Sequence, residues 1–184
     1  EKNSYLFQMP FSKNGMDALA YEINQALLLL TQPRIKAIAV DADNTLWGGI
    51  VGEDGVENLQ CDQNYPGIIY KKFQHRLIKL KESGVVLILL SKNNERDVQD
   101  VFEKKEMPLR LHDFIATAVN WKSKSENLAS LLETLRLTKE GVIFLDDSET
   151  EILEMESRLG IRCYKMNPSH HRYNLNVLDD NTCL

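Results

Sequence analysis

Three short apolar runs constrain what this 184-residue chain can fold into. They cover residues 35–40, 85–90 and 142–145, and a polar cluster follows each one. Strands whose residues are apolar without alternation are typical of parallel sheets that helices cover on both faces. Residues 161–166 form a fourth candidate strand. The runs therefore predict a mostly parallel sheet.

Stretches with helical spacing of apolar residues lie between these runs. Ser123 and Ser148 open two of them, each with a glutamate three residues later, which is a capping-box pattern. A further helix is predicted over residues 16–30, before the first strand. Strand and helix thus alternate, so we expect an α/β fold, a Rossmann-like parallel sheet flanked by helices. The other predicted helices are centred on 68–80, 98–102, 128–135 and 152–159.

Length and composition exclude several classes of protein. A chain of this length favours one domain, so we expect a single domain over 1–184, with an N-terminal extension at 1–33, a core at 34–166 and a C-terminal tail at 167–184. The 22 Lys and Arg against 27 Asp and Glu give a net charge of −5, which argues against nucleic-acid binding.

The remaining composition bears on the protein's location. The 3 cysteines show no CxxC spacing, which excludes a disulfide framework and a zinc site and favours the cytoplasm. No apolar run is long enough for a membrane helix, so no membrane contact is expected. Because the chain begins at Glu1, we expect it to be part of a longer polypeptide.

Acidic residues follow two of the apolar runs. Asp41 and Asp43 follow the first, and Asp146 and Asp147 follow the third. Ligands of open parallel sheets bind at the carboxyl ends of the strands, so these carboxylates converge if the strands are neighbours. Their mutual repulsion requires a cation, and oxygen ligands of this kind suit Mg²⁺ together with a phosphorylated substrate.

The residue types at these strand ends suit phosphoryl transfer. Asp41 can act as a nucleophile that forms an acyl phosphate, and Asp43 can give or take a proton. Ser91, after the second run, and Lys124 can hold phosphoryl oxygens. Lys124 lies in the first turn of a predicted helix, where the helix dipole also favours an anion.

Four segments resemble the motifs of the haloacid dehalogenase (HAD) superfamily. They read VDADNTLWGG, SKNNE, NWKSK and FLDD, and they occur in the family's order within residues 35–159. The longer stretches DADNTLWGGIVGEDG, LLSKNN and VNWKSKSEN resemble the FkbH-like branch of that superfamily. One departure concerns Leu90, because the branch commonly has Cys at that position.

The resemblance implies a set of site residues. It makes Asp41 the nucleophile and Asp43 the acid/base, while the segment 47–55 forms a small flap and no large cap exists. Trp47 lies at the start of this flap and is equally a candidate for core packing. The implied Mg²⁺ ligands are Asp41, Asp43 through its backbone carbonyl, and Asp146, with Asp147 acting through water; the phosphate-binding residues are Ser91, Asn93 and Lys124, and the substrate-pocket residues are Trp47, Gly48 and Gly49.

The resemblance also implies an activity. FkbH-like members take a phosphorylated three-carbon acid of the 1,3-bisphosphoglycerate type, release phosphate and load a glyceryl or lactyl unit onto the phosphopantetheine thiol of an acyl carrier protein in polyketide biosynthesis. We expect this activity, within a larger polyketide synthase polypeptide. Two alternatives stay open, a Mg²⁺-dependent phosphatase acting on small phosphomonoesters or a phosphoprotein, and a non-catalytic domain that docks a carrier protein.

Overall fold

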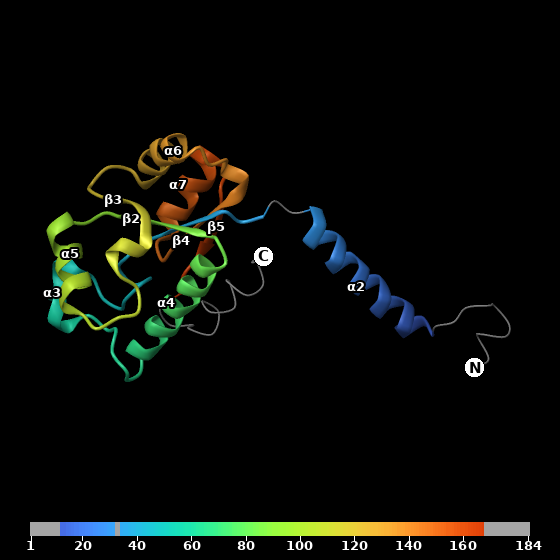
Figure 1. Ribbon diagram of the computed structural model, residues 1–184, viewed down its shortest axis with the longest axis horizontal. Coiled ribbons are helices and arrows are strands. Elements are labelled where there is room, and N and C mark those ends of the chain that lie inside the picture. Colours follow the sequence, from blue (N-terminus) through green and yellow to red (C-terminus); the bar gives the residue numbers. More distant parts are fainter. Residues whose placement is uncertain (1–11, 32–33, 168–184) are drawn as a thin grey trace. The chain divides into compact units, whose positions relative to one another are not determined.

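The computed structural model describes residues 12–31 and 34–167, and these residues separate into two compact units (Figure 1). The first unit holds helix α2, Lys13–Thr31, where a helix was predicted. The second holds every other element. Except for Asn167, the predicted C-terminal tail lies outside the described residues. No described helix combines the length and the apolarity needed to cross a bilayer.

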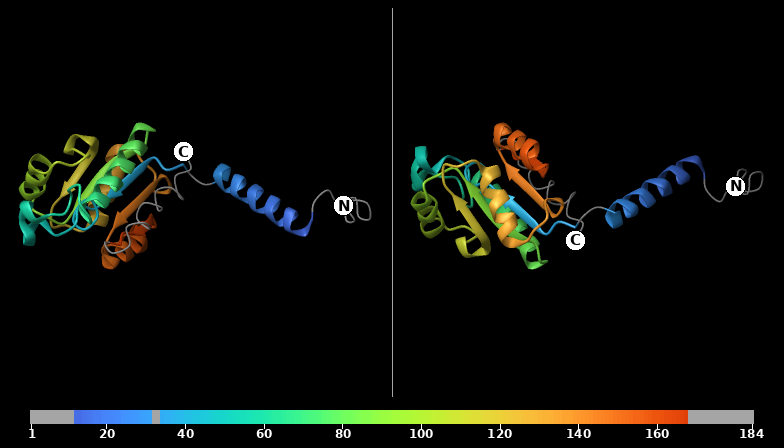
Figure 2. Two further views of the ribbon diagram at one scale, coloured as in Figure 1. Left: turned by 90° about the horizontal axis from the view of Figure 1, so that it is seen from below. Right: turned by 90° about the horizontal axis from the view of Figure 1, so that it is seen from above.

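Five parallel strands form the sheet, in the order β3-β2-β1-β4-β5. Helices lie on both of its faces, which confirms the predicted α/β fold (Figure 2). The central strands are the most apolar because both of their faces are covered. The strands are β1 Ala37–Val40, β2 Val86–Ser91, β3 Phe114–Val119, β4 Val142–Asp146 and β5 Arg162–Lys165.

Two apolar clusters, one on each face of the sheet, make up the core. Helices α4 and α5 contribute side chains to one cluster, and α6 and α7 contribute to the other. Ser123 and Ser148 cap α6 and α7 as the sequence predicted, each accepting a hydrogen bond from the backbone N–H three residues later. The helices are α3 Val51–Asn58, α4 Gly67–Glu82, α5 Glu95–Lys104, α6 Lys124–Leu135 and α7 Glu149–Leu159, and the 3₁₀ turns are η1 Leu111–Asp113 and η2 Lys139–Gly141.

Two elements were not expected from the sequence. Strand β3 is an edge strand in which Ala116 and Ala118 alternate with more exposed residues, and Ile115 is 55% exposed. It therefore lacks the long run of large apolar residues that marks the central strands. The expected flap contains the short helix α3, which has a break at Gly55, where φ is 71°.

The strand order determines which residues meet at the carboxyl edge. Strand β1 lies between β2 and β4, and Val40 is paired with both Leu89 and Leu145. The chain therefore leaves β1 at the same level as the ends of its two neighbours. This places the polar segments that follow the three apolar runs next to one another.

Candidate active site

Lys124 joins two carboxylates at the carboxyl edge of the sheet. Its Nζ lies 2.6 Å from Oδ1 of Asp41 and 2.7 Å from Oδ2 of Asp146. All three side chains are buried, with at most 7% of their surface exposed. Asp41 follows β1, Asp146 ends β4 and Lys124 begins α6, so three distant parts of the sequence form one ionic cluster.

Burial changes the proton affinity of each member of this cluster. It raises the pKa of Asp41 from 3.8 to about 7, although the charge of Lys124 opposes the rise. It also raises the pKa of Asp146, against the same opposing charge. Burial acts to lower the pKa of Lys124, but the charges of Asp41 and Asp146 outweigh it and raise that pKa. The lysine therefore remains charged.

Asp147 adds a third carboxylate. One oxygen each from Asp41, Asp146 and Asp147 lie within 4.8 Å of one another. Burial raises the pKa of Asp147, and the charge of Asp146 raises it further. Grouped carboxylate oxygens are hard ligands that suit Mg²⁺, so this donor set fits such an ion. The carboxylate of Asp43 is not part of this group.

Asp43 is instead held by three donors. Its Oδ1 accepts hydrogen bonds from the indole N–H of Trp47, at 2.8 Å, and from the backbone N–H of Val51, at 3.1 Å. Its Oδ2 accepts one from the side-chain amide of Asn93, at 2.9 Å. Trp47 is fully buried, so its ring packs beneath the site and does not line an open pocket. The bond between Trp47 and Asp43 was not predicted from the sequence.

Ser91 and Asn93 lie beside Asp43. The Asn93 amide nitrogen also donates to Oγ of Ser91, at 3.0 Å, and both residues are buried. Because this amide group already has two acceptors, Asn93 orients Asp43 and Ser91 in this arrangement. The Ser91 hydroxyl accepts the Asn93 bond and keeps its own hydrogen available for an anion.

The first turn of α6 is fixed by a glutamate that lies in none of the four sequence motifs. Glu154, in α7, accepts hydrogen bonds from the hydroxyls of Ser123 and Ser125, the latter at 2.6 Å. These two serines flank Lys124. The i, i+3 capping pattern predicted the role of Ser123, but a contact between two helices has no such local signal.

The glycines of the expected substrate pocket have packing reasons for their identity. A Cβ atom at Gly48 would lie 2.8 Å from Oε1 of Gln60, with which Gly48 is paired through backbone hydrogen bonds. Gly49 has φ of 102° and donates its N–H to the side chain of Asn44. Both glycines thus fit the tight turn after β1, and a role in substrate binding stays a prediction.

No reactive cysteine is found at the two positions where one could carry an acyl group: Leu90 stands where the FkbH-like branch has Cys, and Cys61, which follows the flap segment, is buried. Leu90 is fully buried in the cluster beneath α6 and α7. Cys61 is 3% exposed, and burial raises the pKa of its thiol to about 11. Since the thiolate is the nucleophilic form, Cys61 is poorly suited to carry a covalent intermediate.

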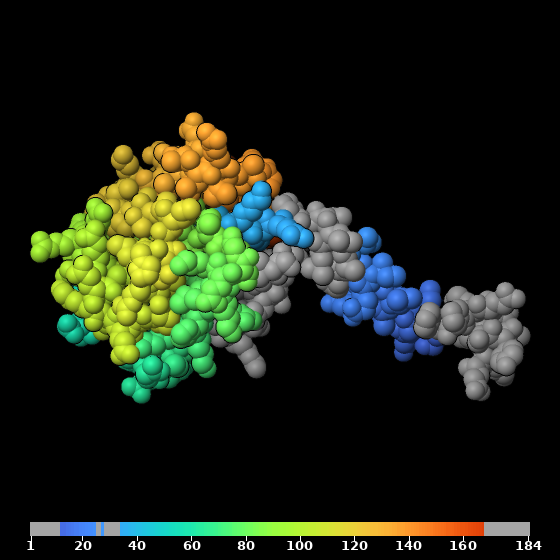
Figure 3. All heavy atoms as spheres, viewed as in Figure 1, coloured from blue at the N-terminus to red at the C-terminus, as the bar shows by residue number. Residues whose placement is uncertain are grey.

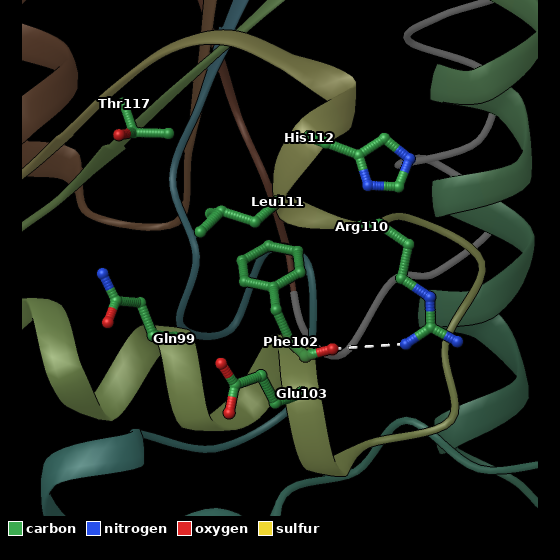
Figure 4. A pocket seen from close by; sticks show the side chains of 7 residues that line it. All are labelled: Gln99, Phe102, Glu103, Arg110, Leu111, His112 and Thr117. Carbon is green, nitrogen blue, oxygen red and sulfur yellow. Dashed lines mark hydrogen bonds between the residues drawn. The ribbon is translucent and has the colours of Figure 1, made fainter.

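A cavity of about 570 Å³ lies away from these residues, between α5, η1 and β3. Phe102 and Leu111 contribute its apolar lining, and Arg110 and His112 lie at one side (Figure 4). Figure 3 shows the η1 and β3 segment in yellow at the surface, between α4 in green and α6 in orange. None of the carboxylates described above lines this cavity.

Comparison with known proteins gives structural relatives only. No protein-family model and no curated protein matches the sequence significantly. One similar structure is the N-terminal part of protein BF1531 from Bacteroides fragilis, which contains a phosphatase domain complexed with Mg. It is 27% identical with a TM-score of 0.79, and the match covers 98% of this chain and 49% of that one. The chain therefore spans about half the length of this relative.

Two more distant structures share the fold. A predicted HAD-like family hydrolase from Porphyromonas gingivalis is 14% identical, with a TM-score of 0.55, over 78% of this chain and 98% of that chain. The other is the wild-type HAD family enzyme bt-2542 from Bacteroides thetaiotaomicron, in complex with magnesium and inorganic phosphate. It is 16% identical with a TM-score of 0.51, and the match covers 71% of this chain and 93% of that chain. The chain therefore has a HAD-like fold.

Proposed function

We propose that this protein is a Mg²⁺-dependent phosphoryl-transfer enzyme that hydrolyses phosphate esters or anhydrides through Asp41. The observation that carries the proposal is the group formed by Asp41, Asp146 and Asp147, with Lys124 in contact with two of the three. A buried acidic group of this composition suits a cation and a phosphorylated ligand far better than it suits a structural role. The similarity to a Mg-bound phosphatase domain supports the same conclusion.

The acidic residues would hold the ion. Asp41, Asp146 and Asp147 supply carboxylate oxygens, and the resemblance to HAD enzymes adds the backbone carbonyl of Asp43. Mg²⁺ bound there supplies positive charge that offsets the charge of phosphoryl oxygens. Lys124 and the Ser91 hydroxyl add a second source of positive potential and a hydrogen-bond donor.

The reaction proceeds in two steps, and Asp41 and Asp43 take part in both. In the first, an oxygen of Asp41 bonds to phosphorus, the bond from phosphorus to the leaving oxygen breaks, and Asp43 gives that oxygen a proton. In the second, the water oxygen attacks phosphorus, the bond from phosphorus to the Asp41 oxygen breaks and Asp43 takes a proton from the water, so phosphate leaves and Asp41 is restored. Buried Lys124 keeps Asp41 oriented, because its ammonium group is anchored on Asp146 as well.

The experiment compares hydrolysis of p-nitrophenyl phosphate with Mg²⁺ and with EDTA. We expect activity only with Mg²⁺, and a loss of at least about 1,000-fold in Asp41→Asn. Asp113→Asn is the matched control, because Asp113 pairs with Lys81 and accepts a hydrogen bond from the backbone of Arg110, and neither partner is a site residue. Activity that survives in Asp41→Asn would reject this residue as the nucleophile.

A second candidate function is the loading of a glyceryl or lactyl unit from a phosphorylated three-carbon acid onto an acyl carrier protein. The segments DADNTLWGGIVGEDG and VNWKSKSEN support it, because they resemble the FkbH-like branch. In this reaction the carrier thiol attacks the acyl carbon of the acyl phosphate, a C–S bond forms, the bond from that carbon to the phosphate oxygen breaks, and phosphate leaves. Incubation with carrier protein, Mg²⁺ and 1,3-bisphosphoglycerate, followed by mass spectrometry of the carrier, should show the added acyl mass. An unchanged carrier mass together with phosphate release would reject the loading activity and support the phosphatase activity.

A further inference from the structure

We propose that Trp47 is a positioning residue that fixes the Asp43 carboxylate for proton transfer. This inference rests on the proposed function, in which Asp43 exchanges a proton with the leaving oxygen and then with water. Trp47 donates its indole N–H to Oδ1 of Asp43 over 2.8 Å, and the ring has no exposed surface. A buried indole N–H normally has an acceptor. Here that acceptor is the candidate acid/base.

The hydrogen bonds of Asp43 come from three separate segments. Trp47 belongs to the turn after β1, Val51 begins α3 and Asn93 follows β2. Trp47 and Val51 donate to one carboxylate oxygen, and Asn93 donates to the other. The torsion that rotates a carboxylate has a broad energy minimum, so hydrogen bonds rather than rotamer preference determine its orientation. Together these donors define one plane for the carboxylate.

Trp47 is itself held by aromatic packing. Its ring meets Phe102 edge-to-face, with centroids 5.7 Å apart and an interplanar angle of 79°. Phe102 in turn meets Phe114 at 5.8 Å and 74°. Offset and edge-to-face arrangements are the favoured geometries of aromatic pairs. The indole N–H therefore has a fixed direction, supplied by α5 and β3, and Phe102 also forms part of the cavity seen in Figure 4.

Proton transfer depends on such orientation. General acid catalysis contributes a rate factor of roughly 10²–10⁴ when donor and acceptor are positioned. An alkyl phosphate needs a proton on its leaving oxygen, whereas p-nitrophenyl phosphate has a stable anion as leaving group and needs little help. Loss of the Trp47 hydrogen bond should therefore slow the alkyl ester much more than the aryl ester.

The test measures kcat/KM for both esters in Trp47→Phe, because kcat/KM reports the first step and not the hydrolysis of the phosphoenzyme that the two esters share. This variant keeps a buried aromatic ring and removes the N–H. We expect kcat/KM to fall by about 100-fold for glycerol phosphate and by less than about 3-fold for p-nitrophenyl phosphate. Trp121→Phe is the matched control, because it removes the indole N–H of an exposed tryptophan, which donates to Asn94 and not to Asp43. It should leave the ratio of the two kcat/KM values as in the wild type.

A second replacement covers the case in which Trp47→Phe does not fold. Biosynthetic replacement of the Trp47 indole by benzothiophene keeps the two-ring shape and puts sulfur in place of the N–H. The same selective loss on glycerol phosphate supports the inference. Equal losses of kcat/KM on both esters, or a ratio changed as much by Trp121→Phe, would overturn it and leave the proposed function intact. A wild-type protein that hydrolyses neither ester would overturn the proposed function, and this inference with it.

Discussion

Lys124 carries the only side-chain cation in contact with Asp41 and Asp146 among the residues that the structure describes. Two buried carboxylates close together are stable only when positive charge lies near them, because their repulsion is weakly screened at low dielectric. Removal of one partner from a buried ionic group usually costs about 3–5 kcal/mol. The lysine is therefore expected to contribute to folding as well as to phosphate binding.

We predict that Lys124→Met lowers the free energy of unfolding by about 3 kcal/mol in EDTA. Added Mg²⁺ should recover part of this loss, because a cation bound to the acidic group stabilises the folded state by mass action. Urea denaturation with and without Mg²⁺ measures both effects. Lys122→Met is the control: Lys122 is exposed, so its loss should stay within about 0.5 kcal/mol. Equal losses in the two variants would contradict the prediction.

At the scale of the element, hydrogen bonds join the first turn of α6 to α7. The Ser123 and Ser125 hydroxyls donate to Glu154, and these bonds lower the pKa of that carboxylate. Hydrogen bonds to an ionised carboxylate favour its charged form. The contact therefore links the position of Lys124 to the ionisation of a residue on another helix.

This contact predicts a pH-dependent stability. Because the folded state lowers the pKa of Glu154, its stabilisation is complete above the ordinary value of 4.5 and is lost as pH falls through the lowered value. The melting temperature of the wild type should therefore be higher than that of Glu154→Gln at pH 7. The difference between the two melting temperatures should become smaller below pH 4.5. Glu156→Gln, an exposed change in the same helix, provides the comparison. A gap that is constant with pH would refute this assignment.

The turn after β1 gives a second prediction at this scale. Gly49→Ala places a Cβ at a φ of 102°, only 2.8 Å from Oδ2 of Asp54, and should cost about 1–3 kcal/mol of unfolding free energy. Gly52→Ala, in α3, meets no atom within 4 Å and should be neutral or stabilising by up to about 1 kcal/mol. Thermal unfolding of the two variants checks the contrast. Similar melting temperatures would show that the turn tolerates a side chain.

On the scale of the whole molecule, residues 34–167 contain the complete sheet, both apolar clusters and every candidate site residue. Helix α2 belongs to a different compact unit. A domain keeps its fold when the removed segment contributes nothing to its core. The boundary between the two units, before Arg34, is thus the position at which the chain can be shortened.

We predict that a chain beginning at Arg34 folds cooperatively and keeps the Mg²⁺-dependent hydrolysis of the full chain. Its melting temperature should lie within about 4 °C of the full chain, which corresponds to a change of about 1 kcal/mol at this size. Calorimetry and the p-nitrophenyl phosphate assay test the two parts. A much larger drop would mean that residues before Arg34 support the core.

The sequence alone determined the central strands, most of the helices and the identity of the residues at the strand ends. These signals are local: uninterrupted apolar runs for β1, β2 and β4, and the i, i+3 caps at Ser123 and Ser148. Edge strand β3 was not predicted, because its alternating alanines carry little of that signal. Local patterns also cannot say which strands are neighbours, since all the central runs are similarly apolar.

Only the tertiary structure decided which of these residues meet. It placed β1 between β2 and β4, so that Asp41 and Asp146 share the ammonium group of Lys124. It also brought the side-chain amide of Asn93, which follows β2, to the carboxylate of Asp43, a bond between residues 50 positions apart that no spacing rule predicts. The physical reason is that local hydrogen bonding and hydrophobic periodicity are properties of short segments, whereas charge pairing and burial depend on the packing of the whole chain.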